Sequence, residues 1–274
     1  MKKFPVGTCA ILNADPEITF KRAADLGITD VQLICLDGNL QTDDMAKKIL
    51  AAKEKFGMKI YAYFWSGASG PGTWDMYEGQ RSLGLIPAAY RAQRLKEMID
   101  GAAFAHKLGI RDVITHVGFT PENPLDPAYS DLVTSLRHYC NIIKENGQRH
   151  LFEAGQETPI TLLRLIQDIG TGNAGINLDT GNLVLWGKAN PADALHVFGK
   201  YVWQCHCKDA RYPTDPRYMG EEVKLGTGHV DFKRVVEGLR KLDFKGALII
   251  EREVSDSAEQ ARDILEAKAY LESL

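Results

Sequence analysis

Four side chains in the second half of the chain have the types and the spacing that could hold a metal ion. Glu153, Asp179, His206 and Glu251 each follow a short apolar or β-branched run, in the segments RHLFE, AGINLD, VWQCH and GALIIE. If these runs are strands, each residue lies near the carboxyl end of its strand. Three oxygen donors and one imidazole suit a hard or borderline divalent ion: Mn²⁺ or Mg²⁺ first, with Zn²⁺, Co²⁺ or Fe²⁺ as alternatives.

The charge balance of this group favours a bound cation. Three carboxylates that converge would repel one another, and their burial would cost several kcal/mol unless a cation neutralised them. At any single position, a carboxylate paired with a lysine or capping the next helix is the simpler explanation. That explanation does not account for an ionisable residue at the end of four consecutive strands.

The segment QCHCKDA raises the question of whether Cys205, His206 and Cys207 form a thiolate metal site. Side chains alternate across a strand, so an inward His206 leaves both cysteines pointing outward. A cysteine in a helix layer behaves as a small hydrophobic residue. We therefore expect His206 to be the ligand and the two cysteines to be buried in the core.

Eight strand-like runs alternate with eight amphipathic helical patterns along the chain. We expect strands at 5–11, 30–36, 59–65, 112–118, 149–154, 174–182, 202–210 and 246–253. The expected helices span 18–27, 42–57, 90–109, 129–147, 158–170, 191–201, 231–244 and 257–274. This alternation predicts an α/β fold, a single (β/α)₈ TIM barrel over residues 1–274. A doubly wound open sheet is the alternative, but the chain has no glycine-rich first turn for a dinucleotide.

Two connections that leave the carboxyl ends of strands are unusually long, one after the third strand and one after the seventh. Active sites of barrels lie at this end. The loops carry Trp74, Tyr77, Tyr212 and Tyr218, which could cover a sugar-sized ligand. Alternatively, these aromatic residues pack on one another or form an oligomer contact.

The composition indicates which classes of partner to expect and in which compartment the protein works. The formal net charge of −3 offers no basic surface for a nucleic acid. No apolar run reaches the roughly 20 residues of a membrane helix, so we expect no membrane partner. Five cysteines, an odd number in a chain of this length, suit a reducing compartment. We expect a cytoplasmic protein that acts on a small molecule, with a homo-oligomer left open.

At the quoted motifs the chain resembles the sugar phosphate isomerase/epimerase family of xylose-isomerase-like TIM barrels. This family includes ketose 3-epimerases and, more distantly, endonuclease IV. The resemblance covers essentially the whole chain and rests on FEAGQET, NLDTGN, CHCKDA, LGTGHVDF and ALIIERE in this order. It assigns the metal to the same four residues, Glu153, Asp179, His206 and Glu251. The segment around FEAGQETP is most similar to a subgroup with bacterial epimerases of 3-keto glycosides.

The resemblance also implies how many metals are bound. Endonuclease IV relatives and ketose 3-epimerases carry a histidine three residues after the strand-six aspartate, where this chain has Asn182. One divalent metal is therefore implied rather than three, Mn²⁺ before Mg²⁺, Co²⁺ or Zn²⁺. The departure also weakens the assignment to ordinary ketose epimerisation.

The activity implied is that of a metal-dependent sugar epimerase or isomerase. The metal would acidify a C–H bond next to the carbonyl of a ketose or keto-glycoside and stabilise the enediolate. Glu153 and Glu251 would be the catalytic carboxylates, one on each face of the intermediate. The alternative is a lyase or deglycosylase, in which the same intermediate expels a leaving group from a keto-glycoside.

Five further residues are candidates for contact with the sugar substrate. His116 and Lys208 could bind substrate oxygens, although His116 could equally be a packing residue and Lys208 could form a salt bridge to Asp209 or Glu251. Asn182 could donate to a hydroxyl or fix a turn. The remaining two candidates are Glu157, which could alternatively cap a helix, and Trp65, as an apolar wall.

Overall fold

A computed structural model describes residues 3–274 of the chain, and eight parallel strands close into a barrel. The strand order around the barrel is β1-β10-β7-β6-β5-β4-β3-β2. The barrel strands are β1 (Val6–Ile11), β2 (Asp30–Cys35), β3 (Lys59–Trp65), β4 (Asp112–Thr115), β5 (Arg149–Glu153), β6 (Ala174–Asp179), β7 (Val202–Cys207) and β10 (Leu248–Ile250). The predicted (β/α)₈ fold is confirmed.

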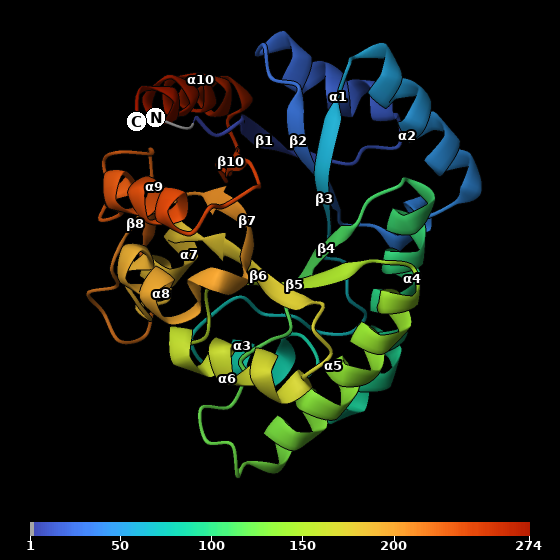
Figure 1. The fold of residues 1–274 in the computed structure, drawn as a ribbon, viewed down its shortest axis with the longest axis vertical. Coiled ribbons are helices and arrows are strands. Elements are labelled where there is room, and N and C mark those ends of the chain that lie inside the picture. Colours follow the sequence, from blue (N-terminus) through green and yellow to red (C-terminus); the bar gives the residue numbers. More distant parts are fainter. Residues whose placement is uncertain (1–2) are drawn as a thin grey trace.

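Helices surround the barrel, and the two ends of the described chain lie side by side near the last helix (Figure 1). The α-helices are α1 (Pro16–Asp25), α2 (Asp43–Lys55), α3 (Gly79–Ser82), α4 (Ala88–Lys107), α5 (Pro127–Glu145), α6 (Pro159–Ile169), α7 (Thr180–Leu185), α8 (Pro191–Phe198), α9 (Phe232–Lys241) and α10 (Ser257–Ser273). Two short 3₁₀ helices are η1 (Gly38–Leu40) and η2 (Gly199–Tyr201).

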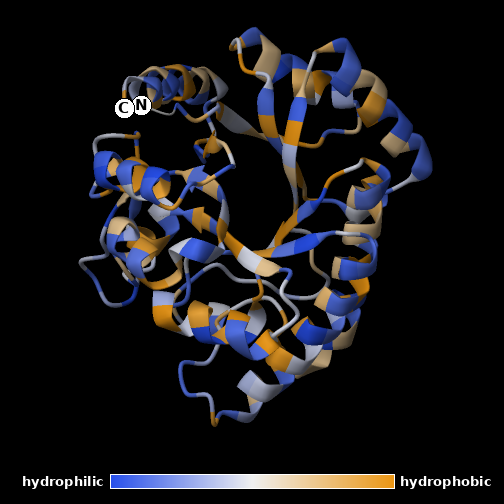
Figure 2. Ribbon diagram, in the orientation of Figure 1, coloured by the Kyte–Doolittle hydropathy of each residue, from blue (hydrophilic) through white to orange (hydrophobic). Residues whose placement is uncertain are grey.

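Local sequence signals begin and end these helices. Asp15, Thr42 and Asp126 each accept a hydrogen bond from a backbone N–H of the helix that follows, which satisfies a donor that has no partner inside the helix. Gly170 ends α6 with a φ of 69°, a conformation that glycine adopts without steric cost. Figure 2 shows hydrophobic and hydrophilic residues mixed along each outer helix, as expected for helices that bury one face.

Two hydrophobic clusters lie on opposite sides of the strands. The larger cluster joins strand residues such as Tyr63 and Phe152 to the helices. The smaller one contains Ile34, Ala62, Phe64, Ile114 and Leu151, which alternate with the first set and therefore fill the barrel interior.

Four strands end three residues earlier than the sequence pattern indicated: β4 at Thr115, β6 at Asp179, β7 at Cys207 and β10 at Ile250. β6 ends at Asp179 because α7 begins at the next residue, and β7 ends at Cys207. Asp209–Arg211 then forms β8, which pairs antiparallel with β9 (Glu221–Val223) as a hairpin above the barrel. The long connection after the seventh barrel strand is thus partly ordered as a small sheet.

The connection after β3, residues 66–87, is held by a buried arginine. Arg94 on α4 donates hydrogen bonds to the carbonyl oxygens of Ser69, Pro71, Ser82 and Gly84. All of these partners are in the loop, so this guanidinium has a structural role. Within residues 3–274, no helix combines the length and apolar character needed to cross a membrane.

Candidate functional site

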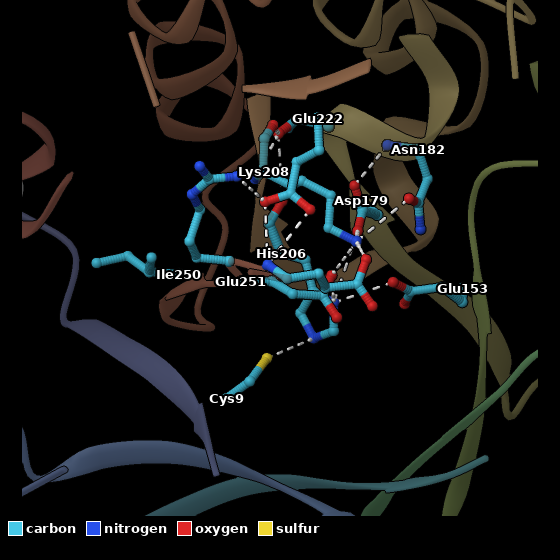
Figure 3. A network of polar contacts seen from close by, with 12 residues as sticks. Cys9, Glu153, Asp179, Asn182, His206, Lys208, Glu222, Ile250 and Glu251 are labelled. Atoms are coloured by element: carbon cyan, nitrogen blue, oxygen red, sulfur yellow. Dashed lines mark hydrogen bonds and ion pairs between the residues drawn. The ribbon is translucent and has the colours of Figure 1, made fainter. Parts of the chain in front are cut away.

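The four predicted metal ligands converge at the carboxyl ends of the strands. One ligand atom each from Glu153, Asp179, His206 and Glu251 lies within 4.8 Å of the other three. His206 Nδ1 is 2.9 Å from Glu153 Oε1, 3.2 Å from Glu251 Oε2 and 3.8 Å from Asp179 Oδ2. Figure 3 shows the three carboxylates around the His206 ring, with Lys208 beside them.

The strand ends determine which side chains meet. Glu153 and Asp179 are the last residues of β5 and β6, His206 is the penultimate residue of β7, and Glu251 directly follows β10. Asp179 pairs with His206 in the β6–β7 register, so their side chains leave the same level of the barrel. Glu153, Asp179 and His206 are buried, and the Glu251 side chain is only 14% exposed.

Asp179 has two separate tasks. Its Oδ1 accepts a hydrogen bond of 2.7 Å from the backbone N–H of Asn182 and so caps α7. Its Oδ2 is buried and makes no hydrogen bond. The helix therefore fixes the carboxylate and leaves one oxygen directed at His206.

Burial and mutual charge shift the pKa values of this group strongly. Burial raises the pKa of Asp179 well above its ordinary value. For His206, burial acts to lower the pKa, but Glu153 and its acidic neighbours raise it well above the ordinary value. Burial opposes ionisation of Glu251 too, yet Lys208 and His206 lower its pKa well below the ordinary range. Positive charge is thus favoured beside these carboxylates, whether on His206 or on Lys208.

The donor atoms fit a divalent cation. His206 Nδ1, Asp179 Oδ2 and Glu251 Oε2 are buried and make no hydrogen bond of good geometry, although Lys208 Nζ lies 2.8 Å from the glutamate oxygen. Buried polar atoms without partners are uncommon in folded proteins. Because three such atoms face one point, and three of the four ligands are carboxylates, a hard or borderline ion suits the site.

Lys208 and Asn182 border the same site. Lys208 is buried, and its Nζ lies 2.8 Å from Glu251, 2.8 Å from Glu253 and 3.6 Å from Asp179. Asn182 lies in the first turn of α7 and accepts a 3.3 Å hydrogen bond from Lys208 through Oδ1. The predicted alternative of a Lys208 to Glu251 ion pair is therefore observed, and both residues line the cavity.

His116 follows β4 directly and lines the cavity. Its ring meets Trp74 edge-on at 4.6 Å and Phe64 at 5.3 Å. Nδ1 is buried and makes no hydrogen bond. Burial lowers the pKa of His116, which favours the neutral ring.

Two predicted substrate contacts do not line the cavity above the four predicted ligands, although Trp65 lines a smaller pocket of about 210 Å³ beside it, together with Trp74 and His116. Trp65 points into the helix layer, where it packs close to Gly101 of α4, because its neighbour Phe64 takes the inward position. Glu157 is buried beneath the β4 loop, accepts a hydrogen bond from Thr120, and is not among the residues that line the cavity. The Glu157 side chain does not cap α6, whose N-cap residue is Thr158.

Three further residues at the site, Gln32, Asn177 and Cys9, were not predicted from the sequence. Gln32 and Asn177 are buried amides inside the barrel that contact His206 and Glu153. Cys9 Sγ lies 3.8 Å from His206 Nε2 (Figure 3), and Cys9, His206 and Glu251 form a second group of possible ligand atoms within 4.8 Å of one another. Polar residues within apolar strand runs were the available signal. Cys205 and Cys207 are buried in the large core, as predicted.

The glycine turn LGTGH, in the region where many barrels bind phosphate, is already filled by a carboxylate of the chain. Asp209 accepts hydrogen bonds from the backbone N–H groups of Gly226, Gly228, Val230 and Ala210. A Cβ at Gly228 would lie 2.3 Å from Asp209 Oδ1, which explains the glycine. These donors hold the loop in place and are not available to a phosphate.

The cavity above the four predicted ligands continues between α1 and α10, and its whole volume is about 740 Å³. Above the predicted ligands, Glu153, Lys208 and Glu251 form a polar wall, and Ile11, Leu36, Phe64 and Trp74 form an apolar wall. Ile11 and Leu36 lie two residues beyond the inward-facing Cys9 and Ile34, so they extend this inner surface. They are 55% and 53% exposed, and Trp74 is 45% exposed. Of the other predicted aromatic cover, Tyr77 and Tyr218 are exposed and not part of the cavity lining.

Comparison with known proteins identifies relatives over the whole chain. Residues 20–274 match the family described as Xylose isomerase-like TIM barrel. A xylose isomerase domain protein from Planctomyces limnophilus has a solved structure that is 32% identical, with a TM-score of 0.92 over 99% of this chain and 97% of that one. The sequence resemblance to xylose-isomerase-like barrels is thereby confirmed.

Relatives with named activities belong to two reaction classes. The structure of 3-keto-D-glucoside 4-epimerase from E. coli shares the fold, with 18% identity and a TM-score of 0.69 over 99% of this chain and 100% of that one. Inosose dehydratase from Lacticaseibacillus casei is 25% identical over 62% of this chain and 67% of its own length. Sugar epimerases and dehydratases therefore both occur among the relatives.

Proposed function

The chain belongs to the xylose isomerase-like TIM barrel family, and on that premise we propose that it is a divalent-metal-dependent sugar epimerase or isomerase. Its reaction would be proton abstraction next to the carbonyl of a ketose or keto-glycoside. The observation that carries the proposal is the convergence of three carboxylates and one imidazole, with buried donor atoms that make no hydrogen bond, at the mouth of the barrel.

Glu153 and Glu251 are the proton carriers in this proposal. They come from strands on opposite sides of β6 and β7, and both approach His206 Nδ1 from the cavity. One carboxylate would take the proton from the carbon next to the carbonyl, and the other would return a proton to the opposite face. A bound divalent ion would supply Lewis acidity that makes this C–H bond acidic enough for a carboxylate.

Three further residues would bind and orient the sugar. The Lys208 ammonium borders the site and would stabilise negative charge on a substrate oxygen. Its burial costs energy that Glu251, Asp179 and Glu253 offset, and these carboxylates raise its pKa well above the ordinary value. The His116 ring and the Asn182 side chain, which both line the cavity, would each hydrogen-bond a hydroxyl or carbonyl group.

A second candidate is elimination from a keto-glycoside, and the apolar wall favours it as an alternative. Ile11, Leu36 and Trp74 present exposed apolar surface within the same cavity as the carboxylates. A free ketose has little use for this surface, whereas the aglycone of a glycoside would cover it. After the same proton abstraction, the bond to the leaving group at the β carbon would break, and the aglycone would depart.

Deuterium exchange tests the proposed chemistry. The protein would be loaded with Mn²⁺ and incubated in D₂O with a panel of ketoses and 3-keto glycosides, and recovered sugars would be analysed by NMR after removal of the metal. We expect deuterium next to a carbonyl, and loss of exchange in Glu153→Gln and in Glu251→Gln. Glu145→Gln, at the far end of α5, is the matched control and should exchange normally.

The product distinguishes the two reactions. An epimer with retained aglycone supports the epimerase, and released aglycone supports the eliminating enzyme. Exchange that persists in both glutamine variants would refute the roles of Glu153 and Glu251. Absence of exchange across the panel, despite one tightly bound metal, would refute the epimerase proposal for these substrates.

A further inference from the structure

Beneath the four ligands, two buried amides connect Glu153 to His206 across the barrel. Asn177 Nδ2 donates a hydrogen bond to Glu153 Oε2. Gln32 Nε2 donates to Asn177 Oδ1 at 3.4 Å, and Gln32 Oε1 lies 2.7 Å from His206 Nε2. Gln32, Asn177 and His206 have no exposed surface, so water does not replace these contacts.

In this row of hydrogen bonds, which runs from Glu153 through Asn177 and Gln32 to His206, the Glu153 carboxylate determines which group donates in every bond. A carboxylate only accepts, so Asn177 must turn its NH₂ group toward Glu153. Its oxygen then faces Gln32, which must turn its own NH₂ group toward Asn177. The Gln32 oxygen is left for His206 and also only accepts, so Nε2 must carry a hydrogen.

The same row therefore decides which histidine nitrogen can bind a metal. With Nε2 protonated and held by Gln32, Nδ1 is the nitrogen directed at Glu153, Asp179 and Glu251. Partners of this kind orient ligands in metal sites, and their removal costs about 10- to 100-fold in metal affinity. Glu153, at the other end, has one oxygen fixed by Asn177 and one left for the site.

We propose that Gln32 and Asn177 are positioning residues for the metal centre, and that through them Glu153 sets the ring orientation of His206 and presents Nδ1 as its ligand atom. The inference rests on the proposed function, since it assigns how this chain holds the metal of that reaction. It concerns residues on β2 and β6 that do not touch the substrate.

Metal affinity in paired variants tests the role of Gln32. Gln32→Leu removes the acceptor for Nε2–H, and we expect Mn²⁺ affinity, measured by calorimetric titration, to fall about 10- to 100-fold. Gln32→Glu keeps an acceptor oxygen for Nε2–H and loses only the NH₂ group that donates to Asn177, so its affinity should fall clearly less than that of Gln32→Leu. Gln148→Leu, which removes another buried amide whose partners are Ala102 and Ile110, is the control for general destabilisation.

If Gln32 only filled space in the core, Gln32→Glu should lose more Mn²⁺ affinity than Gln32→Leu, because a buried glutamate is tolerated less well than a leucine. Equal loss in Gln32→Leu and Gln32→Glu, or equal loss in Gln148→Leu, would therefore overturn the proposal. Asn177→Leu should weaken Mn²⁺ binding by a similar factor, since Glu153 loses its donor. Unchanged affinity in Asn177→Leu would refute the connection to Glu153.

A second measurement does not require metal. In ¹⁵N-labelled, metal-free protein, the His206 Nε2–H should give a slowly exchanging side-chain signal, assigned by its loss in His206→Gln. We expect this signal to persist in Gln32→Glu and to disappear in Gln32→Leu. If wild type shows no protected Nε2–H, the positioning proposal is wrong whatever the metal does. If the protected signal is present but Mn²⁺ does not bind, the positioning stands and the metal-dependent function fails.

Discussion

The burial of Glu157 makes a quantitative prediction about how stability depends on pH. Burial raises the pKa of this carboxyl from 4.5 to about 7, only partly opposed by the hydrogen bond from Thr120. The native state therefore keeps its proton over a range in which the unfolded chain has already released it. Stability must then fall as pH rises between these two values, and it stays lower at higher pH.

The size of the effect follows from the shift. Each pKa unit corresponds to about 1.4 kcal/mol, so the shift of about 2.5 units gives a full loss of about 3.5 kcal/mol, of which roughly 2 to 3 kcal/mol lies between pH 5 and pH 8. Glutamine has no proton to lose, so Glu157→Gln should remove this part of the pH dependence. The variant should gain stability relative to the wild type as the pH increases.

The assay is urea unfolding followed by tryptophan fluorescence at pH 5 and pH 8, with a chelator present so that the metal site contributes equally. The comparison of the two proteins cancels other titrating groups, including the four ligands. Parallel pH profiles for wild type and Glu157→Gln would show that the carboxyl is not held neutral. In that case, the inference that burial keeps the Glu157 carboxyl protonated would be wrong.

Three further predictions concern the metal, the glycine turn and the apolar wall. Saturation with Mn²⁺ at about 100 times its dissociation constant should stabilise the protein by ~2.7 kcal/mol; thermal unfolding should show this in the wild type and not in His206→Gln, and the binding should weaken at low pH because protons compete for His206. Asp209→Asn should lower the free energy of unfolding by about 3 kcal/mol, since the NH₂ group that replaces one carboxylate oxygen cannot accept from the Gly226 and Gly228 N–H groups; a loss within experimental error would contradict this role. Ile11→Ser combined with Leu36→Ser should reduce affinity for an aryl keto-glycoside roughly tenfold, from about 60 Å² of lost apolar contact at ~25 cal/mol per Å², and leave the methyl glycoside unchanged; an equal effect on both ligands would refute an aglycone site.

The sequence by itself was sufficient for the fold and for the position of the four ligands. Both depend on local rules: alternation within a strand, the order of strand and helix patterns, and the place where each strand ends. His206 faces inward and its neighbouring cysteines face outward for the same local reason. Because parallel strands end at one face of a barrel, residues at four strand ends must meet there.

Only the tertiary structure decided which other residues belong to the site. The pairing of β2 with β3 shifts by one residue, because Val31 pairs with Ile60 and Gln32 pairs with Ala62. After this shift Phe64 faces the barrel interior, so Phe64 and not Trp65 borders the cavity. Glu157 is covered by the β4 loop, and Gln32 reaches His206 from the other side of the barrel. These contacts join residues far apart in the chain, and no local pattern specifies the packing that brings them together.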